Sequence, residues 1–244
     1  SPMGARPALI HREQVLSFSD LVQRASAIGS WLQSLQLPAG AHVGHYLRNS
    51  NAYMEVFTAT GLVGMGHVNV NYRYRDEELV DLCNGLDIQV LVYDSEFAAT
   101  VAAIKPLLTK TVGFLEVDPA ATGAGGQSTP GHDFAVSLSQ LYQTDASDFQ
   151  RNTSSDDLIL IATGGTTGLP KGTQWRHEDM WRKMSVSTSN ALAAKGVKEH
   201  PATMAEHVAN VASLPAGGGF LSLSPLMHGA GLMMALLMMS QGAP

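Results

Sequence analysis

Short apolar runs alternate with amphipathic helical patterns along this 244-residue chain. Apolar runs predict strands at residues 42–47, 67–71, 88–93, 111–117 and 158–162. Helical spacing falls between them, at residues 19–35, 52–64, 76–86 and up to Lys105. Ser19 is the expected cap of the first helix, and Asp76 begins a helix with an acidic first turn. Because such alternation is typical of β-α-β units, the sequence predicts an α/β fold with a largely parallel β-sheet and flanking helices.

Composition excludes several classes of protein. The chain has 15 Lys and Arg against 21 Asp and Glu, a formal charge of −6, so it lacks the basic excess that nucleic acids or anionic membranes attract. With 45% hydrophobic residues it has enough apolar side chains for a core, which argues against disorder. No nucleic-acid partner is expected.

Cysteine usage and hydropathy indicate the compartment. A single cysteine, Cys83, excludes an internal disulfide framework and fits a reducing environment, with a buried, inert thiol as the simplest interpretation. No apolar stretch follows the charge near the N-terminus, so no signal peptide is visible. The apolar run from His228 to Met239 is shorter than the roughly 20 residues of a membrane span. The prediction is a cytoplasmic protein without a transmembrane segment.

A glycine-rich segment directly follows the predicted strand 158–162. It reads Thr163-Gly164-Gly165-Thr166-Thr167-Gly168-Leu169-Pro170-Lys171-Gly172. Glycines permit close backbone approach, threonines and amides donate hydrogen bonds, and Lys171 supplies a cation, which is what a polyphosphate needs. It is not a Walker loop, because Gly172 follows the lysine where that motif has Ser or Thr. The segment is interpreted as a phosphate-binding loop rather than an ordinary glycine-rich turn.

The same segment resembles the phosphate-loop signature of adenylate-forming enzymes, which include acyl-CoA synthetases, luciferases and peptide-synthetase adenylation domains. Their pattern is Ser/Thr-Ser-Gly-Thr-Thr-Gly-x-Pro-Lys-Gly, and this chain departs from it only at Gly164. Residues 6–9 with 16–21 resemble the family's opening strand pair and first helix. Residues 224–231, Ser-Pro-Leu-Met-His-Gly-Ala-Gly, resemble its proline-x-x-histidine motif.

The resemblance implies a two-step reaction. A carboxylate would attack the α-phosphorus of MgATP and expel pyrophosphate, and a thiol, usually that of coenzyme A, would then displace AMP. By similarity, the β- and γ-phosphates would be bound by Thr163, Gly164, Gly165, Thr166, Thr167, Gly168 and Lys171. Lys171 and Thr166 would stabilise the charge that develops on the departing pyrophosphate.

The histidine motif is expected to bind the acid. By similarity His228 would lie near the acyl carboxylate or the adenylate and act in catalysis, with a structural histidine as the alternative. Gly229 and Gly231 would leave room for the acyl group. The Met-rich stretch from Met233 could line an acyl pocket, although a plain buried helix explains it more simply. The acid is therefore expected to be fatty or bulky and hydrophobic, and Gly164 resembles the variant loops of synthetases for long-chain or steroid-side-chain acids.

The remaining candidates weigh less. His42 and His45 face opposite ways on a predicted strand, which does not suit metal binding. His200 and His207 share a possible helical face, but no cysteine or carboxylate cluster completes a site there. No metal site is therefore predicted from either pair. Residues 156–157 are interpreted as a solvated loop pair. Residues 175–179 are interpreted as a helix entry, with framing of the nucleotide loop by Trp175 and Arg176 as the alternative.

The resemblance also predicts the domain organisation. Residues 1–244 are expected to be part of the large N-terminal domain, because the family's magnesium, ribose and adenine ligands and its C-terminal catalytic lysine come after the histidine motif. The chain alone is expected to be inactive. Two alternatives stay open: an adenylation domain that loads a carrier protein, and a non-catalytic nucleotide-binding module that forms a homodimer through its apolar tail.

Overall fold

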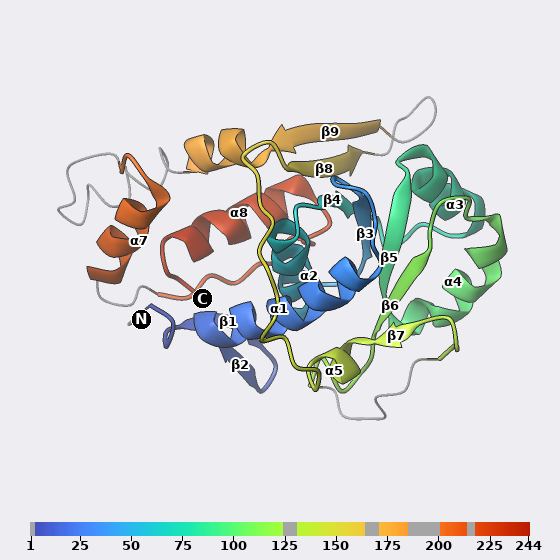
Figure 1. Cartoon of the computed structure of the whole chain (residues 1–244), viewed down its shortest axis with the longest axis horizontal. Coiled ribbons are helices and arrows are strands. Elements are labelled where there is room, and N and C mark those ends of the chain that lie inside the picture. Colours follow the sequence, from blue (N-terminus) through green and yellow to red (C-terminus); the bar gives the residue numbers. More distant parts are fainter. Residues whose placement is uncertain (1–2, 124–130, 164–170, 185–200, 214–217) are drawn as a thin grey trace.

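The computed structural model of the chain describes residues 3–123, 131–163, 171–184, 201–213 and 218–244 (Figure 1). A seven-stranded sheet has the order β7-β6-β5-β3-β4-β8-β9 and is parallel except for the β8–β9 pair. The predicted α/β fold with a largely parallel sheet is thereby confirmed. The strands are β3 (His42–Tyr46), β4 (Gly66–Asn69), β5 (Ile88–Asp94), β6 (Gly113–Val117), β7 (Val136–Ser137), β8 (Leu158–Thr163) and β9 (Lys171–Arg176).

Helices cover both faces of the sheet, as right-handed crossovers between parallel strands require. The helices are α1 (Phe18–Ser34), α2 (Asn51–Leu62), α3 (Asp76–Gly85), α4 (Ala98–Ile104), α5 (Leu138–Leu141), α7 (Met204–Ser213) and α8 (Gly229–Ser240), with a further helical stretch at residues 177–184. A separate antiparallel hairpin, β1 (Pro7–His11) with β2 (Gln14–Ser17), precedes α1. This hairpin and helix match the opening strand pair and first helix that the family resemblance implies.

The first helix begins two residues earlier than the sequence predicts. Ser17, not Ser19, is its N-cap: the Ser17 hydroxyl accepts a hydrogen bond from the Asp20 backbone N–H. The Asp20 carboxylate in turn accepts from the Ser17 backbone N–H at 2.8 Å. This reciprocal capping box satisfies two backbone donors at once, which a cap at Ser19 would not.

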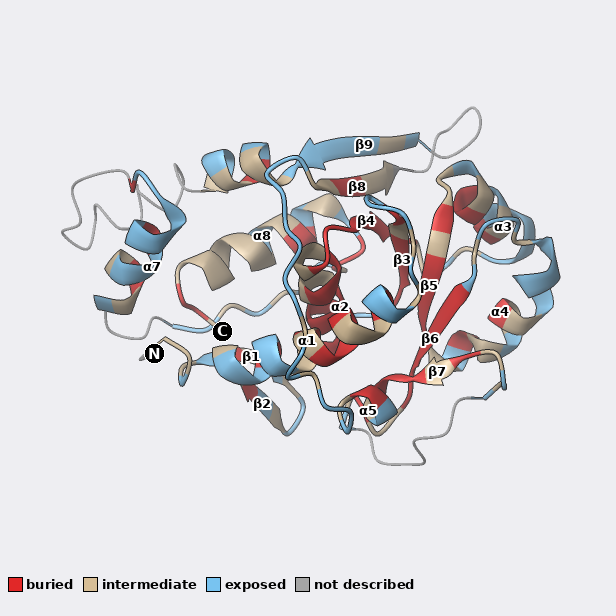
Figure 2. Cartoon of the chain, viewed as in Figure 1, coloured by how far each residue is buried: buried red, intermediate tan, exposed pale blue. Residues whose placement is uncertain are grey.

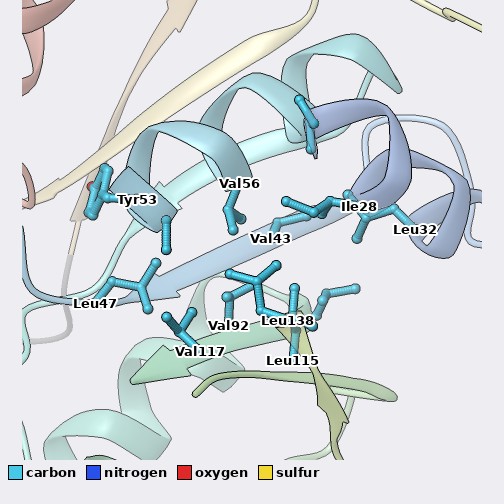
Figure 3. Packing of buried hydrophobic residues seen from close by; sticks show 14 of the residues in the cluster. Ile28, Leu32, Val43, Leu47, Tyr53, Val56, Val92, Leu115, Val117 and Leu138 are labelled. Carbon is cyan, nitrogen blue, oxygen red and sulfur yellow. The ribbon is translucent and has the colours of Figure 1, made fainter. Parts of the chain in front are cut away.

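Two apolar clusters lie on opposite faces of the sheet. Val43, Val92 and Leu115 point from the central strands toward Ile28 of α1 and Val56 of α2 (Figure 3). The second cluster packs the other strand face against α3 and α4. Neighbouring residues of β5 alternate between the two clusters, since successive side chains of a strand point to opposite faces. Burial is concentrated in β3, β5, β6 and α2, whereas β9 is exposed along its length (Figure 2).

Cys83 belongs to the second cluster and is 1% exposed. Burial raises the pKa of its thiol to about 12, so it stays protonated and unreactive at neutral pH. The interpretation of Cys83 as a buried, inert side chain is confirmed.

Two buried histidines occupy the face of the sheet beneath α2. His45 of β3 and His67 of β4 lie edge to face with 4.2 Å between ring centroids. Burial lowers the pKa of His67 to about 3 and moves that of His45 in the same direction. Within the described residues neither ring nitrogen of His67 has a hydrogen-bond partner. Both rings are therefore neutral in the folded chain.

This pair predicts acid destabilisation. Below about pH 6.5 both histidines bind protons in the unfolded chain but not in the folded chain. As the pH falls below that value, each histidine should therefore lower the free energy of unfolding by up to about 1.4 kcal/mol per pH unit. His67→Phe should make the slope clearly shallower between pH 6.5 and 5, as measured by denaturant unfolding. Val68→Ala, at the buried neighbour of His67 in β4, is the control: it removes no titratable group, so it should lower stability and leave the slope unchanged. An unaltered slope in His67→Phe would contradict the assignment.

Candidate functional site

An antiparallel hairpin of β8 and β9 carries the predicted phosphate loop. Its backbone register runs from Leu158 opposite Arg176 to Thr163 opposite Lys171. The predicted binding residues Gly164, Gly165, Thr166, Thr167 and Gly168 lie outside the described residues. The structure places the two ends of that segment side by side, so the hairpin fixes where the loop leaves and re-enters the sheet.

The helix entry predicted at residues 175–179 is present. Strand β9 ends at Arg176, and the helical stretch begins at residue 177. The Arg176 guanidinium donates to the Asp156 carboxylate at 2.9 Å. This ion pair spans the open end of the hairpin, so Asp156 is a partner in a surface ion pair and Arg176 lies at the end remote from the loop.

The histidine motif lies near the carboxyl end of β8, the end that leads into the phosphate loop. His228 precedes α8 and is its N-cap, with its backbone N–H donating to the Pro225 carbonyl at 3.0 Å. The side chain of His228 is exposed, whereas Leu226 and Met227 before it are buried. The imidazole can therefore meet a ligand while the preceding segment is anchored in the core.

Close packing accounts for the two glycines of the motif. A Cβ added to Gly231 would lie 2.5 Å from the Pro225 carbonyl oxygen, so a side chain there collides with rigid backbone. At Gly229 the nearest atom would be the Ile161 Cδ1 at 3.2 Å, the end of a flexible side chain. Gly231 is thus needed for the fold of the motif itself. That Gly229 and Gly231 leave room for an acyl group stays a prediction.

Asn69, the last residue of β4, connects the two motifs. Its carboxamide oxygen accepts from the Ala162 backbone N–H at 2.6 Å, and its nitrogen donates to the carbonyls of Ala162 and Met227. Ala162 directly precedes Thr163, and Met227 directly precedes His228. The structure therefore brings the loop ends and the histidine together. Sequence reasoning missed Asn69, although a polar residue between Val68 and Val70 in a buried strand was a usable signal.

An apolar cavity of about 190 Å³ lies beside α8. Its lining includes Leu226, Ala235, Met238 and Met239, together with Met54 of α2. Parts of α8 pack against the first core cluster, while Met234 is 44% exposed. The Met-rich stretch is thus a half-buried helix that packs against the first core cluster and also lines a cavity, and its role in an acyl pocket stays a prediction.

Two of the other candidate histidines lie within hydrogen-bond distance of backbone carbonyls. A ring nitrogen of His42 lies 2.6 Å from the Leu86 carbonyl oxygen, and one of His207 lies 2.7 Å from that of Ser240. His200 lies outside the described residues. Among the described residues no group of three His, Cys, Asp or Glu side chains could hold a metal ion.

Comparison with known proteins decides the family. The family model described as AMP-binding enzyme matches residues 2–244. This chain belongs to the AMP-binding enzyme family. The adenylate-forming resemblance and the fold class are thus confirmed.

Two similar proteins are named as CoA ligases. The chain is 32% identical to 3-oxocholest-4-en-26-oate--CoA ligase of Rhodococcus rhodochrous over 200 residues, which covers 80% of this chain and 34% of the relative. It is also 32% identical to a medium/long-chain-fatty-acid--CoA/3-oxocholest-4-en-26-oate--CoA ligase of Mycobacterium marinum, covering 76% of this chain and 34% of that one. The chain spans about a third of the length of these relatives.

Solved structures share the fold. A natural red-emitting luciferase from Phrixothrix hirtus matches with a TM-score of 0.71 at 15% identity, over 96% of this chain and 41% of that one. None of the helices in the described part of the chain is long and apolar enough to cross a membrane.

The contacts of Gly231 generate a stability prediction. Gly231→Ala should lower the unfolding free energy by about 1–3 kcal/mol, because the added Cβ must displace the Pro225 backbone. The control Gly229→Ala, at the first residue of α8, meets only the end of the flexible Ile161 side chain, so it should be nearly neutral. Denaturant unfolding of both variants checks this. Equal effects would mean that the close approach at Gly231 carries no energetic weight.

Proposed function

We propose that the protein to which this chain belongs activates a carboxylic acid with ATP, forms an acyl-adenylate and transfers the acyl group to coenzyme A. The observation that carries the proposal is the β8–β9 hairpin, whose paired ends Thr163 and Lys171 lead into the phosphate-loop signature next to the histidine motif. Ligands of α/β sheets bind beyond the carboxyl ends of the strands. At this end of the sheet Thr163 ends β8, and Asn69 holds the segment before His228.

Charge stabilisation and positioning are the chemical requirements of the first step. In this proposal the loop residues Thr163 to Gly168 surround the β- and γ-phosphates, and Lys171 and Thr166 stabilise the departing pyrophosphate. ATP brings magnesium with its phosphates, and no described residue is assigned as a protein ligand of that ion. His228 donates a hydrogen bond to the acyl carboxylate or adenylate, with Gly229 and Gly231 beside it.

The proposed acid is fatty or bulky and hydrophobic. Two observations support this choice: the apolar cavity beside α8, and relatives that are named for medium- and long-chain fatty acids and for a cholestenoate. Coenzyme A is the proposed acceptor because these relatives are CoA ligases. A homodimer and a cytoplasmic location remain part of the proposal.

The proposal is tested by carboxylate-dependent exchange of pyrophosphate into ATP. The longest protein that the gene encodes, given a panel of acids, should exchange best with a long-chain or steroid-side-chain acid. Lys171→Ala should reduce exchange on the order of 100-fold or more, as expected when a cation for developing charge is lost. Lys110→Ala, which removes an exposed lysine paired with Asp87, is the matched control and should leave exchange unchanged.

The outcomes separate the alternatives. Exchange without discharge of the adenylate by free coenzyme A would favour an adenylation domain that loads a carrier protein. A protein that binds ATP but exchanges with no acid would favour the non-catalytic module and contradict the proposal.

A second prediction concerns the 244 residues by themselves. They span about a third of their relatives, and the family's magnesium, ribose and adenine ligands are expected after the histidine motif. The purified 244-residue chain should therefore form no acyl-CoA from ATP, coenzyme A and the acid that the longest gene product prefers. Chromatographic detection of acyl-CoA above the no-enzyme rate would overturn this expectation.

A further inference from the structure

The buried side chain of Asn69 replaces backbone pairing where β4 ends. Strand β4 pairs with β8 at His67 opposite Ile159 and at Val68 opposite Leu160. Ala162 lies two residues further along β8, and there the Asn69 side chain accepts from its N–H at 2.6 Å and donates to its carbonyl at 3.3 Å. The sheet contact therefore continues, through one carboxamide, to the residue before Thr163.

The same carboxamide anchors the histidine motif. Its nitrogen donates to the carbonyl of Met227, a residue that is 2% exposed. A buried carbonyl without a hydrogen-bond donor destabilises the fold, so this contact also holds the segment in place. Only an amide side chain offers an acceptor and two donors from one short group, and Asn69, 5% exposed, uses all three.

A second asparagine contacts the histidine segment alone. Asn49, beyond the end of β3, donates to the Ser224 carbonyl at 3.0 Å and accepts from the Leu226 N–H at 2.7 Å. Asn49 is exposed, and its side-chain hydrogen bonds in the described part of the chain go to the histidine segment and not to β8. The two asparagines therefore offer a natural comparison: one holds the histidine segment, and the other holds it together with the phosphate-loop strand.

We propose that Asn69 is a positioning residue that sets the distance between the phosphate loop and His228. The inference rests on the proposed function, in which the loop holds the triphosphate of ATP and His228 meets the carboxylate. In-line attack on the α-phosphorus requires both substrates in one geometry, and a misplacement of about 1 Å can cost on the order of 100-fold in rate. A single carboxamide that contacts the backbone next to both motifs controls that geometry directly.

The test compares pyrophosphate exchange by variants of the longest protein that the gene encodes. Asn69→Ala should lower the kcat of exchange on the order of 100-fold while the KM for ATP changes by less than about threefold, since the loop residues themselves remain. Asn69→Ser, whose hydroxyl can serve one partner, should lose less activity and serves as the milder variant if Asn69→Ala folds poorly. Asn49→Ala should raise the KM for the acid and leave ATP binding unchanged.

Two controls separate positioning from loss of stability. Ser137 lies on β7, the edge strand at the other end of the sheet from β8 and β9. Ser137→Ala removes its buried hydrogen bond to Asp118 and should lower the melting temperature without lowering kcat. In a His228→Ala background the Asn69→Ala change should cost several-fold less than in the wild type, because residues that act through one another are not additive.

The outcomes are distinct. An Asn69→Ala protein that melts earlier but keeps kcat within twofold of the wild type would overturn the inference and leave the proposed function intact. Full additivity with His228→Ala would overturn it as well. A wild-type protein that exchanges pyrophosphate with no acid would overturn the proposed function, and this inference with it.

Discussion

Strand β8 lies beside β4 although 93 residues separate Asn69 from Ala162 in the sequence. This non-local contact joins the β-α-β core to the hairpin that carries the phosphate loop, and it depends on a short backbone register and one buried carboxamide. Forming it closes a long loop, which costs conformational entropy. The burial of Ile159 and Leu160 against the sheet offsets that cost.

The contact also explains where the site lies. The carboxyl ends of β4 and β8 meet at one sheet edge, and α8 begins at the same edge because Asn69 and Asn49 hold the segment before it. The N-terminus of α8 faces this edge, with the exposed side chain of His228 at its cap. The end of β8 and the histidine motif thus converge because the sheet is parallel there, because Asn69 ends β4 and because Asn49 follows β3.

Polar groups buried beneath the helices limit the conditions in which this arrangement is stable. Glu55 of α2 is fully buried; burial raises its pKa, while the Tyr142 hydroxyl and the Arg24 guanidinium favour its charged form. The guanidinium also lies 4.5 Å from the centre of the Tyr142 ring, so α1, α2 and the segment after α5 meet at one group. The neutral rings of His45 and His67 are a second set of buried titratable groups, and they lie on the sheet itself.

The sequence by itself determined the elements whose patterns are local. Apolar runs and helical spacing identified the central strands, α1 to α3 and the α/β class, because the periods of 2.0 and 3.6 residues are properties of the backbone. The signature at residues 163–172 and the histidine motif determined the family for the same reason, since those residue types lie close together in the chain.

Tertiary structure decided what depends on distant partners. The run Lys171–Arg176 has no inward-facing apolar pattern, so the sequence gives no sign that it is a strand paired with β8. The cap at Ser17 instead of Ser19 depends on a reciprocal bond with Asp20. Asn69 is one polar residue in an apolar strand, and only the folded chain brings Ala162 and Met227 within its reach, because hydrogen bonds between segments follow from packing and not from sequence spacing.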